Sequence, residues 1–318
     1  MTAYIIRRFI QALAVLIIAS AVVFLVMNLL PGDPIRIYFS SSALGRATPE
    51  QIALWRHEFG LDRPLIVQYV DWVSHVFRGD LGDSIMKGEK VSTLIARRLP
   101  ITIYLGLPAF LMSLIFGITA GVLSAIKRGR PLDTGVTVFA NLGICAPIFW
   151  VGIVMIYLFA LYLGWLPTCG YTSPFEDFWL STRQIIMPVF CLSMFDMAAT
   201  ARQTRSAMLE VTRQDYIRTA WAKGLRERTV IIRHALKNSL IPVIAYQGMC
   251  ISDILGVSVI IETVFNIPGM GRLSVESIFN HDYAVIQGII LIIAIIVTMA
   301  NLLVDLSYGW LDPRVRYE

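Results

Sequence analysis

The sequence is poor in charged residues and in the residue types that usually build metal or catalytic sites. Only 15% of its 318 residues are Asp, Glu, Lys or Arg, and it has four histidines and four cysteines. The histidines do not pair at metal-ligand spacing, and the cysteines form neither a metal motif nor a disulfide framework. We therefore predict no metal site.

A phosphate-binding loop is also missing. The pattern Gly-x-x-x-x-Gly-Lys-Ser/Thr does not occur, and neither does a nucleophile elbow or a paired-carboxylate motif. The chain is therefore predicted not to be an enzyme by itself, with no catalytic residue and no cofactor of its own. Energy for any active process would come from a separate ATPase or from an ion gradient.

Hydrophobic residues are what the sequence has in excess. They make up 56% of the chain, and the mean hydropathy of +0.67 is too high for an ordinary soluble domain. We predict an all-α integral membrane protein with six transmembrane helices, the third interrupted at Ala146-Pro147. Each is long enough to cross a hydrocarbon core of roughly 30 Å. The spans cover residues 9–30, 101–126, 136–163, 185–204, 240–261 and 285–306.

These spans divide the chain into three predicted domains. Residues 1–30 hold the N-terminal end and the first span, residues 31–100 form an external helical subdomain, and residues 101–318 form a five-helix core. In the subdomain, Thr48 begins one helix with a capping box, and a second has apolar residues at helical spacing from Leu65 to Phe77. The segment from Gly79 to Ser84 is typical of a plain turn cluster.

Basic residues indicate the orientation. The net charge is +5 and the isoelectric point about 9.1, but the basic residues fall between spans, without the aromatic and basic interleaving of nucleic-acid sites. We therefore expect no nucleic-acid partner. With the N-terminus inside, the two short external loops hold only Arg183 and Arg272. Both termini are predicted to be cytoplasmic.

Residues 205–240 form a basic cytoplasmic loop that is predicted to be folded. One helix begins at the N-cap residue Asp215 and ends at Gly224, where a left-handed residue fits. A second runs from Arg226 to Ser239 and meets Pro242 at the start of the next span. The alternative is a solvated basic loop that only fixes topology.

This loop carries a family resemblance. Residues 216–225, Tyr-Ile-Arg-Thr-Ala-Trp-Ala-Lys-Gly-Leu, and the stretch from His234 to Pro242 resemble the cytoplasmic signature loop of ABC importer permeases. The variant is similar to that of the dipeptide, oligopeptide and nickel family, in particular its dipeptide-permease B-type subunits. The general pattern begins Glu-Ala-Ala, whereas this chain has Arg218-Thr219-Ala220. Residues 60–65 and 79–84 resemble the extracytoplasmic region of the same family, and for Gly79 to Ser84 this resemblance is a stronger signal than the plain turn cluster. An outer motif from Phe265 to Arg272 and an Asp-Pro-Arg tail extend the resemblance over nearly the whole chain.

The resemblance implies a permease subunit of an ATP-driven importer in the bacterial inner membrane, working by alternating access. The substrate would be a dipeptide, an oligopeptide, a nickel complex or a glutathione-like solute. Implied partners are a second homologous permease, two ATP-binding subunits, which would bind the ATP, an extracytoplasmic solute-binding protein and membrane lipid. The docking residues implied for the ATPase are Asp215, Tyr216, Ile217, Arg218, Thr219, Ala220, Ala222, Lys223 and Gly224.

Three polar residues inside the spans are candidates for the translocation pathway: Asp196, Gln247 and Asp253. Both aspartates come out near the membrane midplane, where a carboxylate costs roughly 2.5 to 3.5 kcal/mol and usually faces a polar cavity. Alternatively, each is protonated or bonded to a neighbouring helix. Glu262 and Asp305 lie near span ends, where they are expected to reach water.

Two other functions stay open on the residues alone. Asp196 and Asp253 could serve a secondary transporter driven by an ion gradient, although no convincing pair of inverted repeats with broken helices is seen. A structural membrane subunit without a pathway would leave two midplane carboxylates hard to explain.

Overall fold

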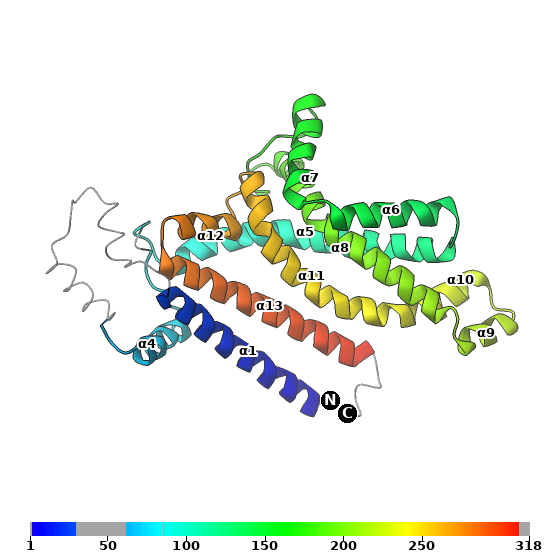
Figure 1. Cartoon of the computed structure of the whole chain (residues 1–318), viewed down its shortest axis with the longest axis horizontal. Coiled ribbons are helices and arrows are strands. Elements are labelled where there is room, and N and C mark those ends of the chain that lie inside the picture. The colour runs from blue at the N-terminus through cyan, green and yellow to red at the C-terminus, as the bar shows by residue number, and fades with distance from the viewer. Residues whose placement is uncertain (1, 30–61, 85, 312–318) are drawn as a thin grey trace. The chain divides into compact units, whose positions relative to one another are not determined.

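The computed structural model of the chain describes residues 2–29, 62–84 and 86–311 (Figure 1). The described residues are almost entirely helical, as predicted. Two predicted features lie outside them, namely the helix from Thr48 to Gly60 and the tail motif at residues 312–314.

Five helices are long and apolar enough to cross a membrane, and a bent pair supplies the sixth span. The predicted six-span fold is therefore confirmed. The five are α1 (Thr2–Leu29), α5 (Val91–Ile126), α8 (Phe178–Val211), α13 (Tyr283–Leu311) and a continuous run that ends in α11 (Lys237–Val264).

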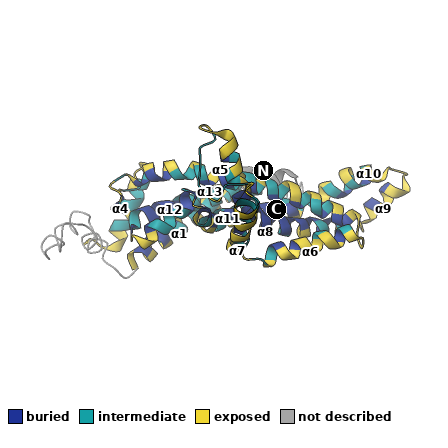
Figure 2. Ribbon diagram, turned by 90° about the horizontal axis from the view of Figure 1, so that it is seen from above, coloured by how far each residue is buried: buried dark blue, intermediate teal, exposed yellow. Residues whose placement is uncertain are grey.

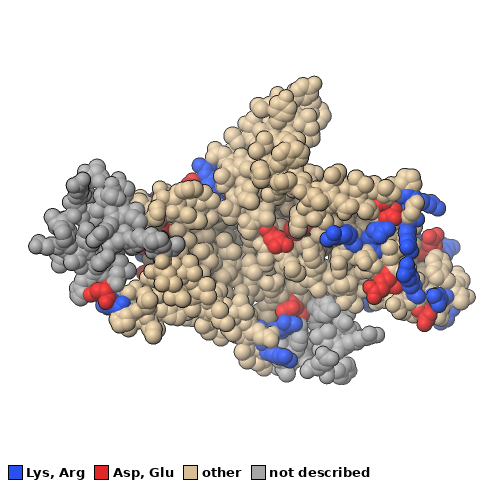
Figure 3. Space-filling view, viewed as in Figure 1, with Lys and Arg blue, Asp and Glu red and all other residues tan. Residues whose placement is uncertain are grey.

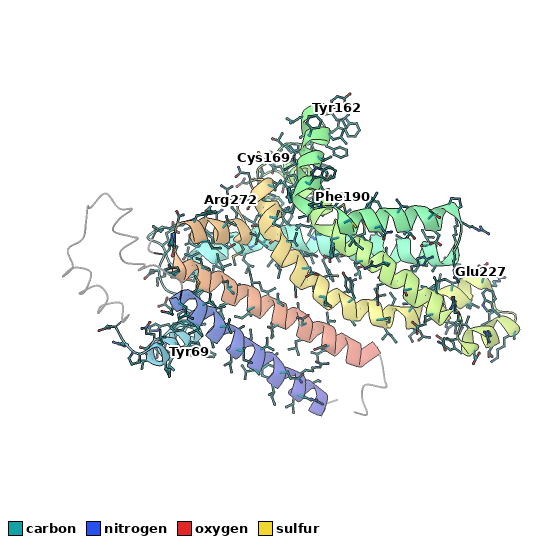
Figure 4. All side chains as sticks on the ribbon, in the orientation of Figure 1. Tyr69, Tyr162, Cys169, Phe190, Glu227 and Arg272 are labelled. Carbon is teal, nitrogen blue, oxygen red and sulfur yellow. The ribbon has the colours of Figure 1, made fainter. Side chains whose placement is uncertain are left out.

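The bent pair confirms the interruption predicted at Ala146-Pro147. Helix α6 (Pro131–Cys145) is followed by α7 (Ile148–Met155) and the π-helix η1 (Ile156–Tyr162), and the two halves are bent by 106°. Proline disfavours a helical backbone at the residue before it, and Ala146 is extended, with ψ of 127°. As a result, α7 and η1 project away from α6 (Figure 1), and Tyr162 lies at the tip of the projection (Figure 4).

By their contacts, the helices form two compact units. Unit 1 comprises residues 1–9, 102–268 and 299–318, and unit 2 comprises residues 10–101 and 269–298. One unit border lies beside the domain border predicted at residue 100, but the five-helix core predicted for residues 101–318 is shared between the units. Both α5 and α13 contribute to each unit, because a long helix has different neighbours along its length.

In unit 2, the amphipathic helix predicted from Leu65 to Phe77 is present as α4 (Leu65–Phe77). It packs against α1 through aromatic side chains. The hydroxyl of Tyr69 (labelled in Figure 4) lies 2.8 Å from that of Ser20, and its ring meets Phe24 edge-on at 5.5 Å. Phe77 is exposed, so the apolar face is only partly covered.

The segment from Gly79 to Ser84 is a folded loop rather than a plain turn cluster. Leu81 packs against a buried cluster from α5, α13 and α12 (Met270–Phe279). The Ser84 hydroxyl donates a hydrogen bond to the Asp282 carboxylate, and both residues are buried. This bond fastens the loop to the junction of α12 and α13.

Helix α8 is the centre of unit 1. Its most apolar stretch is 72% buried, against 28% for that of α5 (Figure 2). Glycines allow the neighbouring helices to approach it closely. A Cβ atom added to Gly121 of α5 would lie 2.5 Å from the Ala201 carbonyl oxygen, and one added to Gly143 of α6 would lie 3.1 Å from the Ala198 Cβ. Small residues serve the same purpose in other membrane helix interfaces.

The second loop helix was predicted to end where the fifth span begins, and this is wrong. Helix α10 (Glu227–Thr229), the π-helix η2 (Val230–Leu236) and α11 form one helix of 38 residues. Pro242 lies inside α11. Proline is tolerated in membrane helices where local π-helical adjustment relieves the backbone, and η2 directly precedes α11 here.

The expectation that Glu262 reaches water is also wrong. Its side chain is 0% exposed, and it accepts a hydrogen bond of 2.6 Å from the Thr102 hydroxyl. The sequence puts Glu262 two residues before the end of α11, but the chain folds back over this end: the backbone amide of Gly170 donates to the Phe265 carbonyl at 3.0 Å. A position near a helix end is therefore not sufficient for solvent access.

Candidate docking loop and translocation pathway

The first helix of the loop at residues 205–240 is α9 (Asp215–Ala222). Its predicted stop is confirmed, since Gly224 has a φ of +72° that favours glycine. Its predicted N-cap is wrong, because Gln214 caps the helix without a side-chain hydrogen bond and Asp215 is the first helical residue. There Asp215 pairs with Arg218 at 3.3 Å, and its negative charge interacts favourably with the positive end of the helix dipole.

Two of the predicted docking residues hold α9 in place. Ile217 and Ala220 are buried in a cluster with Met208 of α8, Ala125 of α5 and two residues of η2. The remaining predicted docking residues are exposed: Asp215, Tyr216, Arg218, Thr219, Ala222, Lys223 and Gly224. The helix therefore has an inner face that fixes it and an outer face that is free to bind.

Trp221 is an exposed residue at the border between the two faces of α9, and it was not among the predicted docking residues. Its side chain is 47% exposed, and Tyr216 is 43% exposed. The Tyr216 hydroxyl accepts a hydrogen bond of 3.0 Å from Asn238, which limits its movement. Exposed aromatic residues on a rigid helix are the usual anchors of protein interfaces. A signal was available, because Trp221 lies within residues 216–225, which carry the family resemblance.

An ion pair between a buried aspartate and a half-buried arginine stiffens the base on which α9 rests. Asp133, at the start of α6, accepts two hydrogen bonds from Arg205 of α8, at 2.7 and 2.9 Å. Its oxygens also accept from the Ser124 hydroxyl of α5 and from the backbone amide of Gly129. A fully bonded, bidentate pair of this kind fixes geometry. Three helices are thus joined one turn before the Met208 cluster.

Positive charge surrounds this base. Figure 3 shows the largest group of Lys and Arg side chains over the end of unit 1 that carries α9, α10 and the turn between α5 and α6. The exposed basic residues there include Lys127, Arg128, Arg130, Arg213, Arg218, Lys223, Arg226 and Arg228.

The three candidate pathway residues lie on two adjacent helices, but they differ in exposure. Asp196 of α8 and Gln247 of α11 are 2% and 3% exposed, whereas Asp253 of α11 is exposed. The Gln247 amide donates a hydrogen bond of 3.0 Å to the Thr200 hydroxyl of α8. Asp196 is close enough to interact with Cys250 and Asp253.

The surroundings of the three residues are correspondingly different. Within the described part of the chain, Asp196 Oδ1 and Gln247 Oε1 are buried without a hydrogen-bond partner. Asp253 instead belongs to an exposed stripe of α11 at helical spacing. The members of this stripe are Pro242, Ala245, Met249, Asp253, Gly256 and Ile260.

Comparison with known proteins gives the family. Residues 117–317 match the family described as the inner membrane component of binding-protein-dependent transport systems, and residues 1–106 match the N-terminal region of such components.

Similar proteins match over most or all of their length. A putative peptide transport system permease protein of Brucella abortus is 43% identical over 321 residues, which cover 100% of both chains. The oligopeptide transport system permease protein AppB of Bacillus subtilis is 40% identical, also over 100% of both. The di/tripeptide transport system permease protein DppB of Pseudomonas aeruginosa is 38% identical over 93% of each.

A solved structure shares the fold. The inward-facing MetNI methionine ABC transporter contains a chain that superimposes with a TM-score of 0.57 at 17% identity, covering 69% of this chain and 96% of that chain. Together with the six spans and the folded loop at residues 205–240, these matches show that the chain belongs to the family of inner-membrane permease components of binding-protein-dependent transport systems.

Proposed function

We propose that the chain is the permease subunit of an ATP-driven importer of peptides or related small solutes, with both termini in the cytoplasm. The observation that carries the proposal is α9, which is fixed on its inner face by Ile217 and Ala220 and free on its outer face. A helix held in this way can receive a partner and pass on its movement. The relatives' names support peptides as the substrate class.

The partners follow from this function. Two ATP-binding subunits would bind and hydrolyse the ATP, one docking on α9, while a second permease completes the passage and a solute-binding protein delivers the substrate outside. The 38-residue helix from Glu227 to Val264 connects the docking loop with Asp253. Closure of the ATPases would therefore move the wall of the passage, which is alternating access.

Co-purification from native membranes tests the proposal. We expect the ATPase subunits and a second permease to accompany the wild-type chain, and the ATPase that docks on α9 to be lost with Gly224→Asp. The reason is that this change adds charge and strain at a φ of +72° beside the outer face of α9. Mass spectrometry of the purified material gives the composition.

Gly164→Asp is the matched control. Gly164 also has a positive φ, of +64°, and open space at its Cβ, but it lies in the turn after η1. The control should retain all partners. A wild-type chain that purifies alone as a homo-oligomer would overturn the importer function and favour transport driven by an ion gradient.

We further propose that Asp253 lines the passage, with Asp196 and Gln247 behind it. A carboxylate on the exposed stripe of a membrane helix is stable where that stripe borders water rather than lipid. The Asp253 carboxylate would favour substrates with positive charge. The buried pair Gln247 and Thr200 would hold α11 against α8 in the orientation that exposes Asp253.

Asp253→Asn is therefore expected to reduce uptake of a lysine-containing dipeptide roughly tenfold. This is the effect of removing one unit charge about 10 Å from the substrate at an effective dielectric constant near 20. Uptake of a dipeptide with uncharged side chains should change less. The Asp253→Glu variant should retain the preference for the lysine-containing dipeptide. Uptake rates in proteoliposomes of the complete importer give the comparison. Unchanged uptake of every cationic substrate would contradict the proposal.

A further inference from the structure

An open groove of about 350 Å³ lies in unit 1 between α5 and α6, with α8 as its floor. We call it the α5–α6 groove. Leu123 of α5 and Leu132 of α6 line the end nearest the turn that joins the two helices. Phe116 and Phe139 line it further along the same helices. The groove thus follows the two helices inward from their connecting turn.

The lining of the groove suits a hydrocarbon chain. Apart from Thr119, its side chains are apolar, and the Thr119 hydroxyl already donates to the Ile115 carbonyl at 2.7 Å. The floor consists of Met197, Ala198 and Ala201. Gly135 leaves the groove open, because a Cβ added there would have no atom within 4 Å. The side chains that line the groove therefore present no unpaired polar group to a polar ligand.

The turn at the end of the groove is strongly basic. Lys127, Arg128 and Arg130 are all exposed there, directly after α5 and before α6. Asp133, the acidic residue in the first turn of α6, is buried and bound by Arg205. Three cations therefore stand at the mouth of an apolar groove without an exposed carboxylate on the same turn.

We propose that the α5–α6 groove binds one acyl chain of an anionic phospholipid, whose phosphate is held by Lys127, Arg128 and Arg130. Basic clusters where membrane helices end bind anionic headgroups, and the apolar groove provides for the chain attached to the headgroup. A membrane helix from another subunit would fill the groove equally well, but an apolar helix would not interact with the three cations at the end of the groove. The three cations therefore favour an anionic lipid over a helix as the occupant.

The test measures lipid that stays bound after purification. The full chain, with the subunits that accompany it, is equilibrated in nanodiscs of dioleoyl phosphatidylglycerol or dioleoyl phosphatidylcholine and then examined by native mass spectrometry. Gly135→Leu places a side chain in the groove, and its Cβ atom has no atom within 4 Å. Gly256→Leu is the matched control, because Gly256 also has open space at its Cβ but lies on α11. A third variant changes Lys127, Arg128 and Arg130 to glutamine.

We expect the wild type and Gly256→Leu to retain phosphatidylglycerol and Gly135→Leu to lose it. In the glutamine variant, affinity should fall on the order of a hundredfold, since each basic residue near the surface contributes about fivefold. Equal retention of phosphatidylcholine, absence of bound lipid from the wild type, or retention unaffected by Gly135→Leu would each overturn the proposal. So would loss of the second permease from Gly135→Leu, because the groove would then seat a helix.

Discussion

Gly121→Leu is expected to abolish the accumulation of folded protein. A Cβ atom at residue 121 would lie 2.5 Å from the Ala201 carbonyl oxygen and 2.6 Å from the Thr204 Cβ. The first of these is a backbone atom of α8, so relief requires α5 and α8 to move apart. Overpacking typically costs about 1–3 kcal/mol and sometimes more. Here it would also expose buried hydroxyl groups of α8.

The monodisperse fraction in size-exclusion chromatography and the unfolding temperature in detergent measure this effect. Gly256→Leu is the control, since a Cβ atom added there has no atom within 4 Å and leucine is a better helix former than glycine. Gly117→Leu should resemble Gly121→Leu, because its Cβ would lie 2.7 Å from the Thr200 Cβ. A normal yield and unfolding temperature for Gly121→Leu would mean that α5 does not pack on α8 as described.

Trp221→Ala is expected to weaken association with the ATPase without weakening the fold. Trp221 is 47% exposed and does not belong to the buried cluster that holds α9. Truncating an aromatic anchor at the centre of an interface costs about 2–4 kcal/mol. This corresponds to a loss of roughly 30-fold to 1,000-fold in affinity. Titration of the ATPase subunit onto permease in nanodiscs measures the affinity.

Trp179→Ala is the matched control for this prediction. Trp179 is 75% exposed and lies near the opposite end of α8 from the loop, so its truncation should leave ATPase affinity unchanged. Ile217→Ala provides a contrast, because loss of a buried contact should release α9 and lower the unfolding temperature of the loop as well. An ATPase affinity unaltered by Trp221→Ala would remove this residue from the docking surface.

The sequence was sufficient to predict the spans, because long apolar runs leave few alternatives. It also predicted the bend at Ala146-Pro147 and the helix stop at Gly224, since both depend on the local backbone preferences of proline and glycine. It did not predict where a helix would continue through a residue that usually ends one. Pro242 is one such case, because whether a proline ends a helix depends on what surrounds it.

The candidate site was predictable in outline only. The sequence indicated that residues 205–240 hold a short helix ending at Gly224, but which face of α9 is buried depends on Met208, Ala125 and η2, which lie elsewhere in the chain. The same holds for Asp196 and Asp253, whose equal depth conceals different exposure. The exposure of a residue depends on how its helix is rotated about its own axis. The depth of one residue in the membrane does not determine that rotation.

The burial of α8 has a consequence for how the protein is made. With Asp196, Thr200 and Thr204 all buried within the protein, α8 is a poor candidate to enter lipid by itself. Its glycine-bearing partners α5 and α6 precede it in the chain and emerge from the ribosome first. During synthesis, α8 can therefore leave the translocon onto α5 and α6, whereas its contacts with α11 form later.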